Sequence, residues 1–136
     1  MRKIILCDFD GTITTQDTLV KILDVFVGPE WRAIEKKVKT GETGNNTALR
    51  EEFALCDPSK ATKEQIVRLL NEQIDIDPHF KTFLDFCKSQ NYEFVIISGG
   101  FSLCIDTILK KHNLTELPYY SNKLLFEKDK LYIEYP

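Results

Sequence analysis

Residues 3–12 read KIILCDFDGT and contain the pattern from which the fold can be predicted. The first half, Lys3 to Cys7, is a short apolar run that stops abruptly at Asp8. Such a run is typical of a strand buried on both faces of a parallel sheet. We therefore expect a sheet strand whose C-terminal end presents Asp8 and the residues that follow it.

A second run of the same form extends from Glu93 to Ile97 and ends at the polar segment 98–100, Ser-Gly-Gly. Residues 8–92 separate the two runs, whereas a simple crossover needs only about a dozen residues including its helix. The spacing of apolar residues predicts that this long insert is helical. Strands that alternate with helices favour right-handed crossovers and a parallel sheet, so both strand ends should meet at one edge.

Turn and capping signals divide the chain further. Helices are expected at 19–26, 29–39, 47–55 and 102–111, and two further helices are expected to begin at Thr62 and at Asp77-Pro78. The tail 119–135 is expected to form two strands joined by a turn at 127–130. The fold class is therefore α/β, a Rossmann-like parallel sheet with an inserted helical cap and a terminal β-hairpin. Residues 1–15 and 77–136 would form the core, and 16–76 the cap.

Composition narrows the classes of function. With 136 residues, 43% hydrophobic and 29% charged, the chain is expected to form a folded globular domain. A net charge of −3 with scattered lysines argues against nucleic-acid binding. The apolar run at the N-terminus is too short for a signal peptide or a membrane span, so we expect a cytoplasmic protein with no membrane contact.

The four cysteines are far apart and lack the spacing of a zinc site. Each lies in an apolar stretch with no obvious base beside it, which favours reduced core residues over a nucleophilic cysteine. They are Cys7, Cys56, Cys87 and Cys104.

Asp8 and Asp10 place two carboxylates two residues apart at a strand end, a pattern suited to Mg²⁺ and phosphate chemistry. One carboxylate can attack phosphorus while the other donates a proton to the leaving oxygen. Backbone amides from Phe9 to Gly11 could hold phosphate oxygens. The alternative is an acidic turn that caps the next helix.

Segment 98–100 could contribute to the same site. Ser98 offers a hydroxyl, and Gly99 and Gly100 allow close backbone approach at the start of a helix. An ordinary loop is the alternative for this segment taken by itself.

These motifs resemble the first two motifs of the haloacid dehalogenase superfamily, and the helical insert resembles its first type of cap. Within the superfamily the chain resembles the phosphoserine phosphatase branch, and Phe26 with Pro29-Glu30-Trp31 is most similar to the phosphatases of methionine salvage. The resemblance covers nearly the whole chain and implies a phosphomonoester phosphatase that uses Mg²⁺ and an aspartyl-phosphate intermediate.

The same resemblance assigns roles to individual residues. Asp8 would be the nucleophile and a metal ligand, and Asp10 the acid/base, with its carbonyl on the metal. Ser98 and Gly99 would hold the phosphate, and Thr12 would brace the loop. Asp17 and Arg50 fall at cap positions that contact substrate in phosphoserine phosphatases, although the family has Glu where Asp17 stands. Their alternative roles are a helix cap and a solvated helix face.

The family's third motif, a lysine, and its fourth, an acidic cluster, are not found in the expected places. The lysines after Ser98 are expected to end a helix or to surround the hairpin, and Asp129 to lie in a turn. These lysines are Lys110, Lys111, Lys123, Lys128 and Lys130. The sheet would therefore be incomplete at the C-terminus, and we expect a truncated product or a fragment.

Two interpretations follow for the function of this chain. The first is a phosphatase, or its N-terminal portion, acting on a small phosphorylated metabolite. The second is an inactive phosphate- or partner-binding module derived from the same fold. In either case, a homodimer or a missing C-terminal half could cover the open sheet edge.

Overall fold

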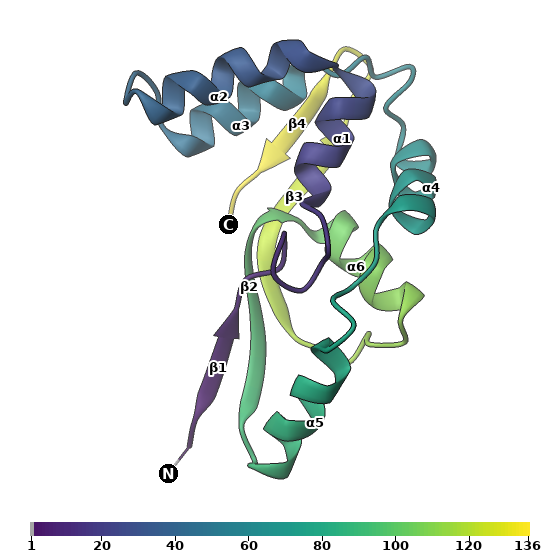
Figure 1. Cartoon of the computed structure of the whole chain (residues 1–136). Helices are drawn as coiled ribbons and strands as arrows, with labels where there is room; N and C mark the ends of the chain where they lie inside the picture. Colours follow the sequence, from purple (N-terminus) through teal and green to yellow (C-terminus); the bar gives the residue numbers. More distant parts are fainter. Residues whose placement is uncertain (1) are drawn as a thin grey trace.

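The computed structural model describes residues 2–136 and contains one four-stranded sheet in the order β1-β2-β3-β4. β1 and β2 are parallel, as are β2 and β3, whereas β4 is antiparallel to β3. The elements are β1 (Ile4–Cys7), α1 (Thr18–Phe26), η1 (Pro29–Trp31), α2 (Arg32–Lys39), α3 (Asn45–Ala54), α4 (Lys63–Gln73), α5 (Phe80–Ser89), β2 (Glu93–Phe101), α6 (Ser102–Lys111), β3 (Tyr119–Phe126) and β4 (Leu131–Glu134). The expected α/β fold, with a helical insert and a terminal hairpin, is confirmed (Figure 1).

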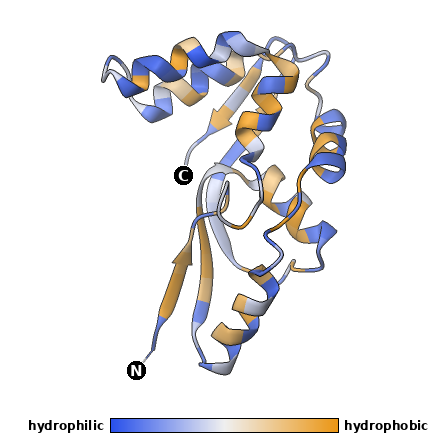
Figure 2. Ribbon diagram, viewed as in Figure 1, coloured by the Kyte–Doolittle hydropathy of each residue, from blue (hydrophilic) through white to orange (hydrophobic). Residues whose placement is uncertain are grey.

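In the part of the chain that the structure describes, helices cover one face of the sheet and leave the other bare. α5 and α6 pack on the covered face, while the α2–α3 pair lies beyond the C-terminal end of β1 (Figure 1). The opposite face carries exposed apolar side chains that are neighbours across the strands, namely Ile4, Leu6, Ile97 and Tyr120, with 48%, 68%, 44% and 69% exposure. Within residues 2–136, the expectation that the first strand is buried on both faces is therefore wrong, because no described element packs on its outer face (Figure 2).

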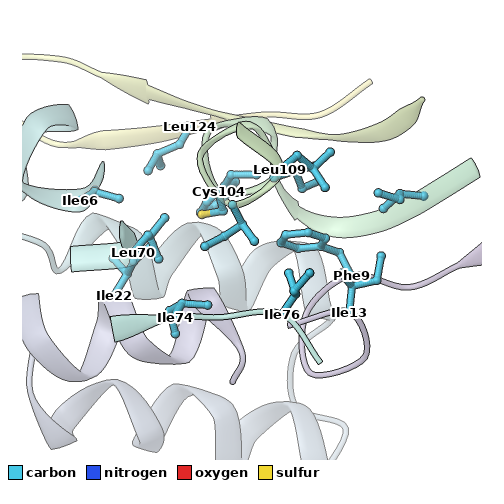
Figure 3. Close-up of a cluster of buried hydrophobic side chains, with 14 of the residues drawn as sticks. Phe9, Ile13, Ile22, Ile66, Leu70, Ile74, Ile76, Cys104, Leu109 and Leu124 are labelled. Carbon is cyan, nitrogen blue, oxygen red and sulfur yellow. The ribbon is translucent and has the colours of Figure 1, made fainter. Parts of the chain in front are cut away.

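The buried face of the sheet and the helices share one hydrophobic cluster (Figure 3). Phe9, next to the strand end, packs with Ile13 and Ile76, while Ile22 of α1 and Leu70 of α4 extend the cluster into the inserted helices. α4 also packs against α6. The insert is thus held by the same core as the sheet, and this fixes α1 beside the strand ends.

The cysteines form no disulfides among residues 2–136. Cys56, Cys87 and Cys104 are buried, and burial raises the pKa of Cys56 to about 11 and that of Cys104 to about 12. These two thiols stay protonated at neutral pH and act as small apolar residues.

Several element boundaries differ from the expected ones, and two of these differences have a clear cause. β2 continues through segment 98–100 to Phe101 because β3 pairs with it there, across an irregularity in the register after Ile97. α5 begins at Phe80 rather than at Asp77, because Asp77 first closes a turn in which its carboxylate accepts the His79 amide at 2.8 Å. Among residues 2–136, no helix has the length and apolarity needed to cross a membrane.

Candidate active site

The loop after β1 is folded around the carbonyl of Phe9. This carbonyl accepts hydrogen bonds from the amides of Thr12, Ile13 and Thr14, at 3.2, 2.9 and 3.2 Å. The Phe9 side chain is fully buried, and Gly11 adopts a φ of +75°, a left-handed conformation that glycine enters without strain. The buried ring anchors the loop, so its two flanking aspartates have fixed positions.

Asp8 and Asp10 have different surroundings. Asp8 is exposed. Within residues 2–136 its only side-chain partner is the Thr12 hydroxyl, which lies 3.5 Å from Oδ2, at the outer limit of a hydrogen bond. Asp10 is mostly buried, and its Oδ1 accepts the Thr18 amide at 2.8 Å and the Thr18 hydroxyl at 2.5 Å. Asp8 is thus available to a ligand, whereas Asp10 is held in place.

Burial raises the pKa of Asp10 to about 6. The hydrogen bonds from Thr18 lower this pKa, and the negative charges of Asp17 and Asp8 raise it, but loss of hydration has the largest effect. A carboxyl group with such a pKa can hold a proton close to neutral pH and release it without a large energy cost. Asp10 therefore has the properties of a general acid.

The ends of β1 and β2 meet, as the parallel topology predicts. Gly100 lies so close to Asp10 that a Cβ at this position would be 2.6 Å from Asp10 Oδ2 and 3.2 Å from Ser98 Oγ. The Ser98 hydroxyl is buried and accepts the Gly100 amide at 2.9 Å, which leaves its own proton to donate. Gly99 faces open space.

The other candidate residues make contacts within the chain itself. Asp17 caps α1 by accepting the amides of Leu19 and Val20 at 2.9 and 3.0 Å. Arg50 is exposed and stacks over the ring of Tyr135 at 5.5 Å. The Gly11 amide donates to Thr14 Oγ1 at 3.0 Å, inside the loop rather than toward a ligand.

Two of the five lysines that follow Ser98 have partners away from the site. Lys111 donates to the Ile74 carbonyl and pairs with Asp75, each at 2.9 Å. Lys130 lies over the ring of Tyr132 at 4.7 Å. These contacts hold neither ammonium group against Asp8.

A Mg²⁺ ion would find only part of a site in the described chain. Asp8 offers an exposed carboxylate and Asp10 a backbone carbonyl, both oxygen donors of the kind Mg²⁺ prefers. Residues 2–136 contain no group of three or more acidic, histidine or cysteine side chains that could hold a metal. The donor chemistry is suitable, but further ligands would be needed.

Three residues that position this site were not identified from the sequence. Thr18 binds Asp10, Thr14 donates to the Gln16 carbonyl at 2.6 Å within the loop, and the buried Asn122 on β3 donates from Nδ2 to the Gly99 carbonyl at 2.9 Å. A polar residue at an inward position of an apolar strand, as Asn122 is, was the available signal. Thr18 gave none, since a threonine beside a helix cap is common.

Comparison with known proteins identifies the family to which this chain belongs. The model of haloacid dehalogenase-like hydrolases matches residues 5–132, so the chain belongs to that family. Among curated relatives, the 2-hydroxy-3-keto-5-methylthiopentenyl-1-phosphate phosphatase of Brevibacillus brevis is 29% identical over 98% of this chain, and that of Exiguobacterium sibiricum is 32% identical over 97%. In both alignments the chain spans 59% of the relative's length.

Solved structures agree with the fold. A phospho-aspartyl intermediate analogue of phosphoserine phosphatase superposes with a TM-score of 0.76 over 98% of this chain and 63% of its own, at 23% identity. A substrate-bound phosphoserine phosphatase complex gives the same TM-score at 22% identity. The resemblance of the fold to the phosphoserine phosphatase branch is thereby confirmed.

Proposed function

We propose that this chain supplies the nucleophile, the general acid and part of the phosphate-binding site of a Mg²⁺-dependent phosphomonoester phosphatase that acts on a small phosphorylated metabolite. The observation that carries the proposal is the contrast between the two aspartates. Asp8 is exposed, while Asp10 is mostly buried with a pKa raised to about 6. An attacking carboxylate and a proton donor are needed side by side in such a reaction.

In the proposed reaction, Asp8 attacks phosphorus and forms an acyl-phosphate bond while the bond to the leaving oxygen breaks. Asp10 gives its proton to that oxygen. Water then attacks the phosphorus, Asp10 accepts a proton from it, and phosphate leaves as the Asp8 carboxylate is restored. The Ser98 hydroxyl and the amide groups of segment 98–100 would hold the phosphate oxygens.

Bound Mg²⁺ would offset the repulsion between the anionic nucleophile and the anionic phosphate. From this chain its ligands would be the Asp8 carboxylate and the Asp10 carbonyl. The names of the relatives support a substrate of the methionine salvage type, a phosphorylated small molecule. The proposed division of the chain assigns residues 16–76 to the cap that would select this substrate.

Hydrolysis of p-nitrophenyl phosphate by the purified chain, with Mg²⁺ and with a chelator, tests the proposal. We expect slow turnover that requires Mg²⁺ and is lost in Asp8→Asn. Asp129→Asn is the matched control, since Asp129 lies in the exposed hairpin turn and should leave turnover unchanged. A folded chain that binds phosphate at Ser98 without any turnover would instead favour the second interpretation, an inactive binding module.

A further inference from the structure

A hollow of about 310 Å³ lies between the cap helices and the sheet, next to the candidate phosphate-binding segment. Gly99 and Asn122 form its sheet side, and Leu19 and Leu49 contribute apolar walls. Its volume lies at the lower end of the range for small-molecule sites, about 300–1,000 Å³. A ligand held at Gly99 by its phosphate would therefore extend into this hollow.

Two carboxyl groups line the cap side of the hollow. Glu52 on α3 is 4% exposed, and its Oε1 has no hydrogen-bond partner among the described residues. Glu35 on α2 lines the same hollow, and its side chain is among the causes that raise the pKa of Glu52. A carboxyl group as buried as that of Glu52 is costly to ionise, particularly beside a second carboxyl group, so its place at this hollow calls for an explanation.

The two carboxyl groups can share one proton. Burial, followed by the hydrogen bond and the charge of Glu35, raises the pKa of Glu52 to about 8. With one proton between them, the pair retains one negative charge and presents acceptor oxygens and an O–H donor. Such a pair binds hydroxyl groups well and repels an anion.

The positively charged side chains nearby lie outside this hollow and do not neutralise the charge of the Glu35/Glu52 pair. Arg32, in an adjoining hollow, is paired with Asp24 at 3.2 Å and stacks over Trp31 at 4.5 Å. Lys39 lines that adjoining hollow and is exposed. Among the described residues that line the hollow at Gly99, Glu35 and Glu52 are the only charged ones.

We propose that Glu35 and Glu52 bind the end of the substrate opposite its phosphate, and that they select phosphate monoesters that carry uncharged hydroxyl groups over those that end in a carboxylate. The inference rests on the proposed function, because it assumes that phosphate binds at Gly99. It assigns specificity to residues of α2 and α3 that no sequence motif indicates.

Glycerol 1-phosphate and 3-phosphoglycerate form a matched pair of probes, since they differ by a hydroxymethyl group in place of a carboxylate. We expect NMR titrations of the chain to show at least tenfold tighter binding of glycerol 1-phosphate. Glycerol 1-phosphate should also shift the side-chain carboxyl resonance of Glu52. Inorganic phosphate, which reaches only segment 98–100, should shift the Gly99 amide and leave Glu52 unchanged.

Substitutions separate charge from shape. Glu52→Gln keeps the charge of Glu35 and should retain the preference within about threefold. The double variant Glu35→Gln/Glu52→Gln removes that charge and should reduce the preference to less than threefold. Glu42→Gln/Glu51→Gln removes two exposed charges, one in the turn between α2 and α3 and one on α3, and should leave the preference intact.

The outcomes are distinguishable. Equal affinity for the two probes, with Gly99 shifted by inorganic phosphate, would overturn this inference and leave the proposed function standing. No shift of Gly99 with any phosphate would overturn both. The carboxyl resonance of Glu52 is read from the wild-type chain, so it decides the matter even if the double variant fails to fold.

Discussion

Gly100 is in contact range of the Asp10 carboxyl group, which joins the ends of two parallel strands at one point. A methyl group on Gly100 would lie 2.6 Å from Asp10 Oδ2, well inside normal contact distance. Asp10 cannot turn away freely, because Thr18 holds its other oxygen through two hydrogen bonds. The site therefore depends on the absence of a side chain at residue 100.

Gly100→Ala should lower the free energy of unfolding by about 1–3 kcal/mol, because either Asp10 gives up the hydrogen bonds from Thr18 or the strand ends separate. Urea unfolding followed by circular dichroism measures this cost. Gly99→Ala is the control in the same strand, since a Cβ there meets no atom within 4 Å. Equal stability of the two variants would show that the contact with Asp10 is unimportant.

Thr18→Val should raise the pKa of Asp10 from about 6 toward about 7, since the lost hydroxyl group stabilised the carboxylate with a charge-assisted hydrogen bond of about 1.5 kcal/mol. Carboxyl ¹³C chemical shifts followed over pH in metal-free buffer report this value. Thr12→Val is the matched control, because the Thr12 hydroxyl is near Asp8 rather than Asp10. An unchanged Asp10 titration in Thr18→Val would contradict the assigned hydrogen bond.

Asp17→Ala should destabilise the chain by about 1 kcal/mol, because α1 loses its N-cap, whereas Asp17→Asn should cost much less, since an asparagine oxygen can accept the same amides. Thermal unfolding of both variants tests the difference. If the two substitutions cost the same, capping is not the main contribution of Asp17. A fall in affinity for phosphate esters in both variants would instead support its substrate role.

Glu52→Gln should become more stable than the wild-type chain as pH rises. The folded-state pKa of Glu52, about 8, lies above its ordinary value of 4.5, so the folded state binds more protons than the unfolded state between these values. Stability from this residue is fully present below about pH 4.5 and is lost as pH rises to about 8. Glutamine avoids the loss.

The gain from Glu52→Gln should therefore be near zero at pH 4.5 and reach about 1–3 kcal/mol by pH 8.5. Chemical denaturation at several pH values measures it. Glu51→Gln, an exposed neighbour on α3, should show little pH-dependent gain. A constant difference between wild type and Glu52→Gln across this range would rule out burial of the charge as the cause.

Local sequence was sufficient for most of the elements. The apolar run before Asp8, the break between the helices expected at 19–26 and 29–39, and the helix start at Thr62 each depend on a few neighbouring residues, and helix and strand formation respond to such short-range signals. The class of fold followed from their order, since strands that alternate with helices form parallel sheets. For the same reason, Asp8, Asp10 and Ser98 could be expected at one sheet edge.

The tertiary structure alone determined the surroundings of these residues. The covering of β1 on one face, the hydrogen bonds of Thr18 and Asn122, and the pairing of Glu35 with Glu52 involve residues distant in sequence or on different elements. Burial and pKa depend on which side chains pack together in space, and no local pattern contains that information. The sequence thus determined which carboxyl and hydroxyl groups are available for chemistry. Packing determined which of these groups is exposed, which is fixed by hydrogen bonds and which can hold a proton near neutral pH.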